Sequence, residues 1–108
     1  MAFSLALQTQ IQIISHYFWM NDKDANGPLT LLDAARTVLQ ATDELLVNEL
    51  YQEMDAYSLT VVSQPTQQRA EAASSPAEGL AILIDEWLRN QNIGISNMDR
   101  TRREAQEL

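Results

Sequence analysis

Cysteine is absent from this chain of 108 residues, and the chain has only three glycines, three prolines and one histidine. Without cysteine there can be no disulfide bond, no thiolate metal ligand and no thiol nucleophile. The single histidine, His16, lies in an apolar stretch with no partner marked by the sequence, although a catalytic base needs one. No glycine-rich phosphate loop and no nucleophile elbow occurs. These absences predict a protein that is not an enzyme.

Basic residues are also few, since 7 lysines and arginines face 15 acidic residues and give a net charge of −8. Nucleic-acid binding depends on clustered basic side chains that neutralise phosphates, so direct binding of DNA or RNA is disfavoured. A basic protein surface or a metal cation is electrostatically permitted. A weaker alternative is that the acids mimic a nucleic acid and block a basic site on another protein, which requires them to gather on one face.

Long hydrophobic runs are missing as well. A membrane-spanning helix needs about 20 apolar residues, and no run approaches that length. The N-terminal stretch has no basic leader of the kind that precedes a secretory signal. We therefore expect a soluble cytoplasmic protein without a membrane partner. The length predicts a single domain over 1–108, and the hydrophobic fraction of 45% is typical of a globular chain.

Hydrophobic periodicity predicts an all-α fold, with helices over 3–20, 28–41, 43–57 and 76–91 and a short C-terminal helix packed as a small bundle. Residues 3–13 also alternate between apolar and polar, and 57–63 are rich in β-branched residues, so an α+β fold with this strand pair is the alternative. Residues 63–75 contain no large apolar side chain and predict a flexible polar link. Residues 95–108 predict a polar tail.

Residues 22–33 read Asp-Lys-Asp-Ala-Asn-Gly-Pro-Leu-Thr-Leu-Leu-Asp. This spacing of oxygen-bearing side chains, with Gly27 at the sixth position for a sharp turn, resembles the calcium loop of an EF-hand. The resemblance implies calcium as the one cofactor, and the shorter carboxylate of Asp33, where the family has glutamate, implies weakened affinity. The implied ligands are Asp22, Asp24, Asn26, the carbonyl of Pro28, Thr30 and Asp33.

A plain connecting loop explains the same residues. Asn26, Gly27 and Pro28 form a turn pattern by themselves, and Pro28 is suited to the first position of the next helix. A second loop, with which EF-hands normally pair, is not visible in the sequence. Both interpretations of residues 22–33 remain open at this point.

Two sets of large apolar residues are candidates for a protein interface. Tyr17, Phe18 and Trp19 are consecutive, and a helix cannot bury all three on one face, so Trp19 is expected to be exposed or at an interface. The helix over 76–91 carries an apolar stripe that, behind a flexible link, could swing out to meet a partner. Its members are Leu83, Ile84, Trp87 and Leu88.

These observations favour a non-catalytic interaction or assembly protein, acting as a homo-oligomer or as a small subunit of a larger complex. The alternative from a different class is a calcium-responsive regulator built on residues 22–33.

Overall fold

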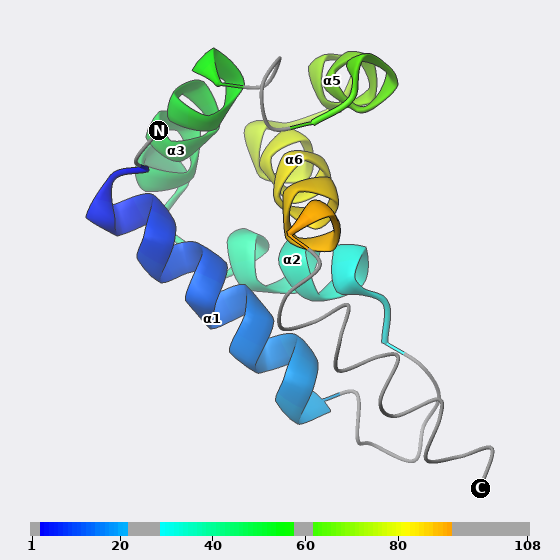
Figure 1. The fold of residues 1–108 in the computed structure, drawn as a ribbon. Coiled ribbons are helices and arrows are strands. Elements are labelled where there is room, and N and C mark those ends of the chain that lie inside the picture. The colour runs from blue at the N-terminus through cyan, green and yellow to red at the C-terminus, as the bar shows by residue number, and fades with distance from the viewer. Residues whose placement is uncertain (1–2, 22–28, 58–61, 92–108) are drawn as a thin grey trace, which may run out of the picture.

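The computed structural model describes residues 3–21, 29–57 and 62–91 (Figure 1). Within these ranges the secondary structure is helical, in the order α1 (Leu5–Asn21), α2 (Leu31–Gln40), α3 (Glu44–Ala56), α5 (Gln64–Glu71) and α6 (Pro76–Asn90). The predicted all-α fold is confirmed. The alternative strand pair is wrong, because residues 5–13 lie inside α1 and carry helical rather than extended backbone.

Helix α6 lies at the centre of the bundle and packs against α2, α3 and α5 (Figure 1). Every residue from Gly79 to Ile84 is buried, and the one polar residue that follows, Asp85, is buried too. A helix that is apolar nearly all round must have neighbours on several sides, since a single neighbour covers only one stripe. The sequence predicted an amphipathic helix here, and the structure shows a central one.

Helix α1 packs along one edge of the bundle, with α2 as its main neighbour (Figure 1). Its core side is a single stripe at spacings of three and four residues, as an amphipathic helix requires. The buried members of that stripe are Leu7, Ile11, Ile14 and Phe18. Burial of this stripe requires a helix over the residues whose alternating pattern also allowed a strand.

Helix α2 begins three residues later than predicted. Thr30 is its N-cap, and the Thr30 hydroxyl accepts a hydrogen bond from the backbone N–H of Asp33 at 3.0 Å. The expectation that Pro28 would open this helix is therefore wrong. The predicted start of α6 is confirmed, because Ser75 caps it by accepting from the N–H of Glu78 and Pro76 occupies the first turn.

The predicted flexible link over 63–75 is wrong, since residues 64–71 of that stretch form α5. The absence of large apolar side chains was misleading, because small ones suffice for close helix packing. Thr66 and Ala70 are buried, and α5 packs on α6. The predicted polar tail over 95–108 lies outside the described residues.

Two glutamates cap helices to which they do not belong. Glu86 of α6 accepts hydrogen bonds at the start of α5, from the backbone N–H of Ser63 and from the hydroxyl of Thr66 at 2.6 Å. Glu53 of α3 accepts at the start of α1, from the N–H and the hydroxyl of Ser4, both at 2.6 Å. Each carboxylate satisfies N–H groups that a helix start leaves without a partner and meets the positive end of the helix dipole.

Burial raises the pKa of Glu86, but the hydrogen bonds from Thr66 and Ser63 outweigh it, so the pKa of this carboxyl lies below its usual range. A carboxylate with a lowered pKa in the folded state stabilises the fold at pH values above its pKa in the unfolded chain. That contribution is lost as the pH falls through the folded-state pKa.

We predict that Glu86→Gln lowers the free energy of unfolding by about 1–2 kcal/mol at neutral pH, because a charge-assisted cap becomes a neutral one. The difference from wild type should shrink as the pH falls through the lowered folded-state pKa of Glu86, below which both proteins carry a neutral side chain. Urea denaturation at several pH values measures this. Glu49→Gln, at an exposed position of α3, is the control and should change little. An equal loss in both variants at all pH values would contradict the capping role.

Gly79 lets three helices meet closely. A Cβ atom at this position of α6 would lie 2.9 Å from the carbonyl oxygen of Ala70 in α5 and 2.9 Å from the Tyr51 ring of α3. Real Cβ atoms do not approach so closely, and the Ala70 oxygen is backbone, so it cannot rotate away. Glycine is therefore required here by close packing.

Gly79→Ala should destabilise the protein by about 1–3 kcal/mol, the usual cost of overpacking a filled core, although alanine is the better helix former. Ala6→Gly, at an exposed position of α1, separates the two effects because it changes helix propensity without changing the core. Thermal and urea unfolding report both. A stabilised Gly79→Ala variant would show that α5 can move away from α6 at little cost.

Candidate functional site

The predicted calcium loop is described only at its end. Asp22, Asp24, Asn26 and Pro28 lie outside the described residues. Thr30 and Asp33 lie at the start of α2, where the Thr30 hydroxyl serves as a helix cap. Within the described ranges, no group of three or more acidic or histidine side chains is arranged to hold a metal ion. The calcium hypothesis for residues 22–33 stays a prediction.

The Asp33 carboxylate already has a cationic partner, Arg36, with which a metal ion would have to compete. Arg36 donates to the Asp33 carboxylate at 3.2 Å, and its other nitrogens donate to both oxygens of Glu78 at 2.7 to 3.0 Å. The hydrogen bond with Glu78 is the largest of the effects that raise the pKa of Arg36, so the guanidinium stays charged. A forked arginine–carboxylate pair is geometrically specific, and this one fastens α2 to the first turn of α6.

The predicted interface residues of α6 are core residues in this structure. Leu83 and Ile84 are fully buried and Leu88 is 8% exposed, so a partner could reach them only if α6 left the bundle. Trp87 is partly buried, and its ring lies 5.3 Å from that of Phe3, measured between centroids. Trp19 is also partly buried. No free apolar surface is present over the α6 stripe.

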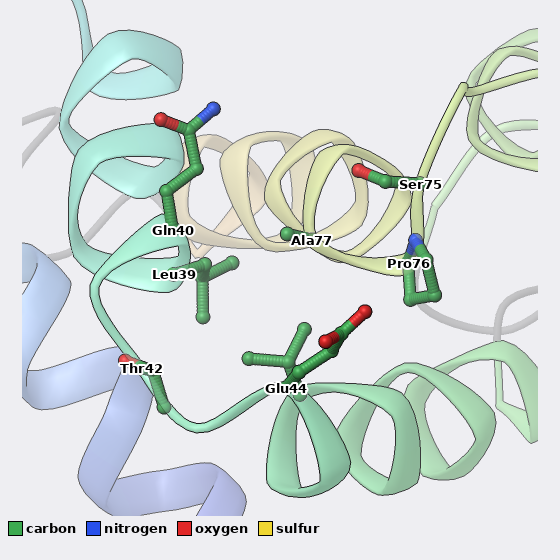
Figure 2. Close-up of a pocket in the computed structure, with 8 residues that line it drawn as sticks. Leu39, Gln40, Thr42, Glu44, Ser75, Pro76 and Ala77 are labelled. Carbon is green, nitrogen blue, oxygen red and sulfur yellow. The ribbon is translucent and has the colours of Figure 1, made fainter.

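One surface pocket lies where the end of α2 meets the starts of α3 and α6 (Figure 2). Figure 2 shows Leu39 of α2, Glu44 of α3, and Pro76 and Ala77 of α6 around it. Its volume of about 250 Å³ is below the range of typical small-molecule sites, about 300–1,000 Å³. Glu44 is its one ionisable side chain, so the pocket has no acid–base pair with which to perform chemistry.

Asp85 of α6 is a buried carboxylic acid and therefore another candidate for a functional group. Burial raises the pKa of its carboxyl, and the neighbouring Arg89 opposes that shift by donating to it at 2.9 Å. Raised carboxyl pKa values occur at active sites but also at structural ion pairs. Asp85 does not line the pocket, and its partner lies one turn away on the same helix. The pair is therefore read as structural.

The outer face of α1 is the strongest surface feature among the described residues. It faces away from the core stripe, and all its members are exposed: Leu5, Thr9, Gln12, Ile13, His16 and Met20. Leu5 is 78% exposed, Met20 55% and Ile13 44%, so three of the four exposed large apolar side chains lie on it. In Figure 1 the other described helices all lie to one side of α1.

Charge sets this face apart from the rest of the molecule. The chain carries a net charge of −8, yet residues 1–21 include no aspartate, glutamate, lysine or arginine. Solvent-exposed helix faces are normally rich in charged residues, whereas the centres of protein interfaces are depleted of them. The outer face of α1 is thus exposed to solvent although its composition is that of a protein interface.

The sequence predicted an interface at Trp19 of α1 and along the apolar stripe of α6, and the central position of α6 buries Leu83, Ile84 and Leu88 of that stripe. A second pattern in the sequence is the stretch without charged residues at the start of an otherwise acidic chain. Taken with the core stripe of α1, it shows that apolar residues occur on both sides of this helix, and only one side can face the core.

Comparisons with known proteins give no relative from which a function could be transferred: no family model, no curated protein and no solved structure matches the chain. None of the described helices is long and apolar enough to cross a membrane.

A calcium titration separates the two interpretations of residues 22–33. The EF-hand resemblance predicts saturable binding below about millimolar calcium, abolished by Asp22→Ala and tightened by Asp33→Glu, which restores the longer ligand. Calorimetry and tryptophan fluorescence on chelator-treated protein measure this, with Glu49→Gln as a control outside the loop. A protein that gives neither heat nor spectral change has a plain loop, and unchanged affinity in Asp33→Glu would contradict the ligand assignment.

Proposed function

We propose that this protein is a non-catalytic assembly module that binds a protein partner through the outer face of α1. The single observation that carries the proposal is an exposed helix face without charged residues on a strongly acidic chain. Exposed apolar groups in water cost free energy that association recovers, at roughly 25 cal/mol per Å² of apolar surface removed from water.

The chemistry of this face suits a protein partner. Leu5, Ile13 and Met20 supply apolar contact area, while Thr9 and Gln12 supply uncharged hydrogen-bonding groups between them. Methionine is enriched at protein interfaces because its flexible side chain adapts to a partner's surface. A nucleic-acid partner is disfavoured, because this face offers no lysine or arginine to phosphates.

The alternative of an acidic mimic of nucleic acid has less support. Several acids of the described residues are occupied inside the fold: Glu53 and Glu86 cap helices, Glu78 binds Arg36, and Asp85 binds Arg89. Mimicry requires carboxylates that are free and gathered on one surface. Carboxylates engaged in these helix caps and ion pairs are not free to contact a basic partner.

Site-specific photo-cross-linking in cells that naturally produce the protein tests the proposal. A photoreactive phenylalanine analogue in place of His16, in the middle of the outer face, should give a discrete product whose peptides mass spectrometry identifies. The matched control is the same analogue in place of Leu45, which is 75% exposed but lies on α3. Adding Ile13→Glu should abolish the His16 product. Equal, diffuse labelling from both positions would contradict an interface on α1.

A further inference from the structure

We infer that α5 is a lid on α6, which undocks and unfolds as one unit while the rest of the bundle stays folded. Its opening uncovers the side of α6 that carries Gly79 and Ile82. This inference goes beyond the proposed function, because it concerns a different pair of helices and requires no partner at α1. It is carried by three properties of α5: its small apolar contact, its length and the origin of its cap.

Helix α5 has little apolar contact with the bundle. Of its eight residues only Thr66 and Ala70 are buried, whereas α1 buries four large apolar side chains. At the closest approach, the backbone of Ala70 lies against Gly79, which has no side chain. The hydrophobic contribution to docking is roughly proportional to the apolar area removed from water, so for α5 it is small.

Helix α5 is also too short to be stable by itself. Isolated helices shorter than about 12–15 residues are marginal in water, and α5 has eight residues. Helices α2, α3 and α6 each begin with a residue whose side chain caps them, namely Thr30, Asp43 and Ser75. The corresponding residue of α5 is Ser63, and its side chain makes no capping hydrogen bond.

The cap of α5 comes from α6 instead. The Glu86 carboxylate accepts from the backbone N–H of Ser63, from the Ser63 hydroxyl at 3.1 Å and from the Thr66 hydroxyl at 2.6 Å. Undocking removes this cap, so docking and helix formation are coupled in α5. From α3, the Tyr51 hydroxyl donates to the carbonyl oxygen of Ala70 at 3.5 Å, which is long for a hydrogen bond.

Opening of α5 exposes an apolar part of α6. Gly79 and Glu86 contact α5 and lie two turns apart on one side of α6, with Ile82 between them at spacings of three and four residues. Ile82 is only 8% exposed in the closed structure. The ion pair of Glu78 with Arg36, which fastens α6 to α2, does not involve α5. The bundle can therefore stay folded while α5 is open.

Native-state hydrogen exchange of the full chain at low urea concentrations tests the inference. The hydrogen-bonded amides of residues 67–72 should share one opening free energy and exchange at least roughly hundredfold faster than those of residues 80–84, after correction for intrinsic rates. Their exchange should hardly depend on urea, because opening exposes much less surface than global unfolding. Equal protection and equal urea dependence in α5 and α6 would overturn the inference, as would protection that declines progressively toward one end of α5.

Three substitutions separate lid opening from global unfolding. Glu86→Gln should accelerate exchange of the α5 amides roughly five- to thirtyfold, because it weakens the cap, whereas Glu49→Gln at an exposed position should not. Ile14→Val, in the core stripe of α1, should accelerate residues 80–84 roughly two- to tenfold and leave residues 67–72 unchanged. Equal acceleration of both sets by Ile14→Val would show that α5 unfolds only with the bundle.

Thiol labelling tests whether α6 is uncovered, and the chain contains no cysteine to interfere. Ile82→Cys should react at least roughly tenfold faster than Ile84→Cys, which replaces a fully buried isoleucine on another side of the same helix. Adding Glu86→Gln should accelerate labelling of Ile82→Cys by the same factor as exchange of the α5 amides. Labelling that does not respond to Glu86→Gln would overturn the uncovering of α6.

Discussion

The burial of α6 on several sides is the constraint on which the rest of the structure depends. A 15-residue helix with an unbroken buried run from Gly79 to Asp85 needs neighbours around it, and α2, α3 and α5 supply them. The polar contacts follow from this packing: Glu78 at the start of α6 binds Arg36 of α2, and Glu86 near its end caps α5. Acidic side chains thus fasten the surrounding helices to the central one.

Helix α1 stands apart from this arrangement and has one neighbour as its principal contact. With its core stripe satisfied by the bundle, its other side is left in water, and that side carries Leu5, Ile13 and Met20 without any charged residue. Covering these side chains with a partner would remove apolar surface from water, which favours association. The packing of the other helices centres on α6, whereas most of the exposed large apolar side chains of the described residues lie on α1, whose main neighbour is α2.

The sequence predicted helices better than it predicted which residues they bury. Hydrophobic spacing predicted the helices over 3–20 and 76–91, because that pattern depends on neighbours within four residues. It missed α5, since Thr66 and Ala70 become core residues only through contact with α6, a tertiary fact. It also took Leu83 and Ile84 for an interface, because an apolar stripe looks the same whether a partner or the chain itself covers it. The calcium hypothesis stays a prediction, because it depends on residues 22–28, which lie outside the described ranges.

The central claim is that association occurs through the outer face of α1 and not through the rest of the surface. Its most direct test is site-specific photo-cross-linking in cells that naturally produce the protein, with the photoreactive residue placed in turn at exposed positions of α1, α3 and α5. The account predicts a discrete product from positions 5, 13 and 20 of α1, and none from position 45 of α3 or position 68 of α5, which are also exposed. Discrete products from α3 or α5 alone, or none from α1, would contradict it.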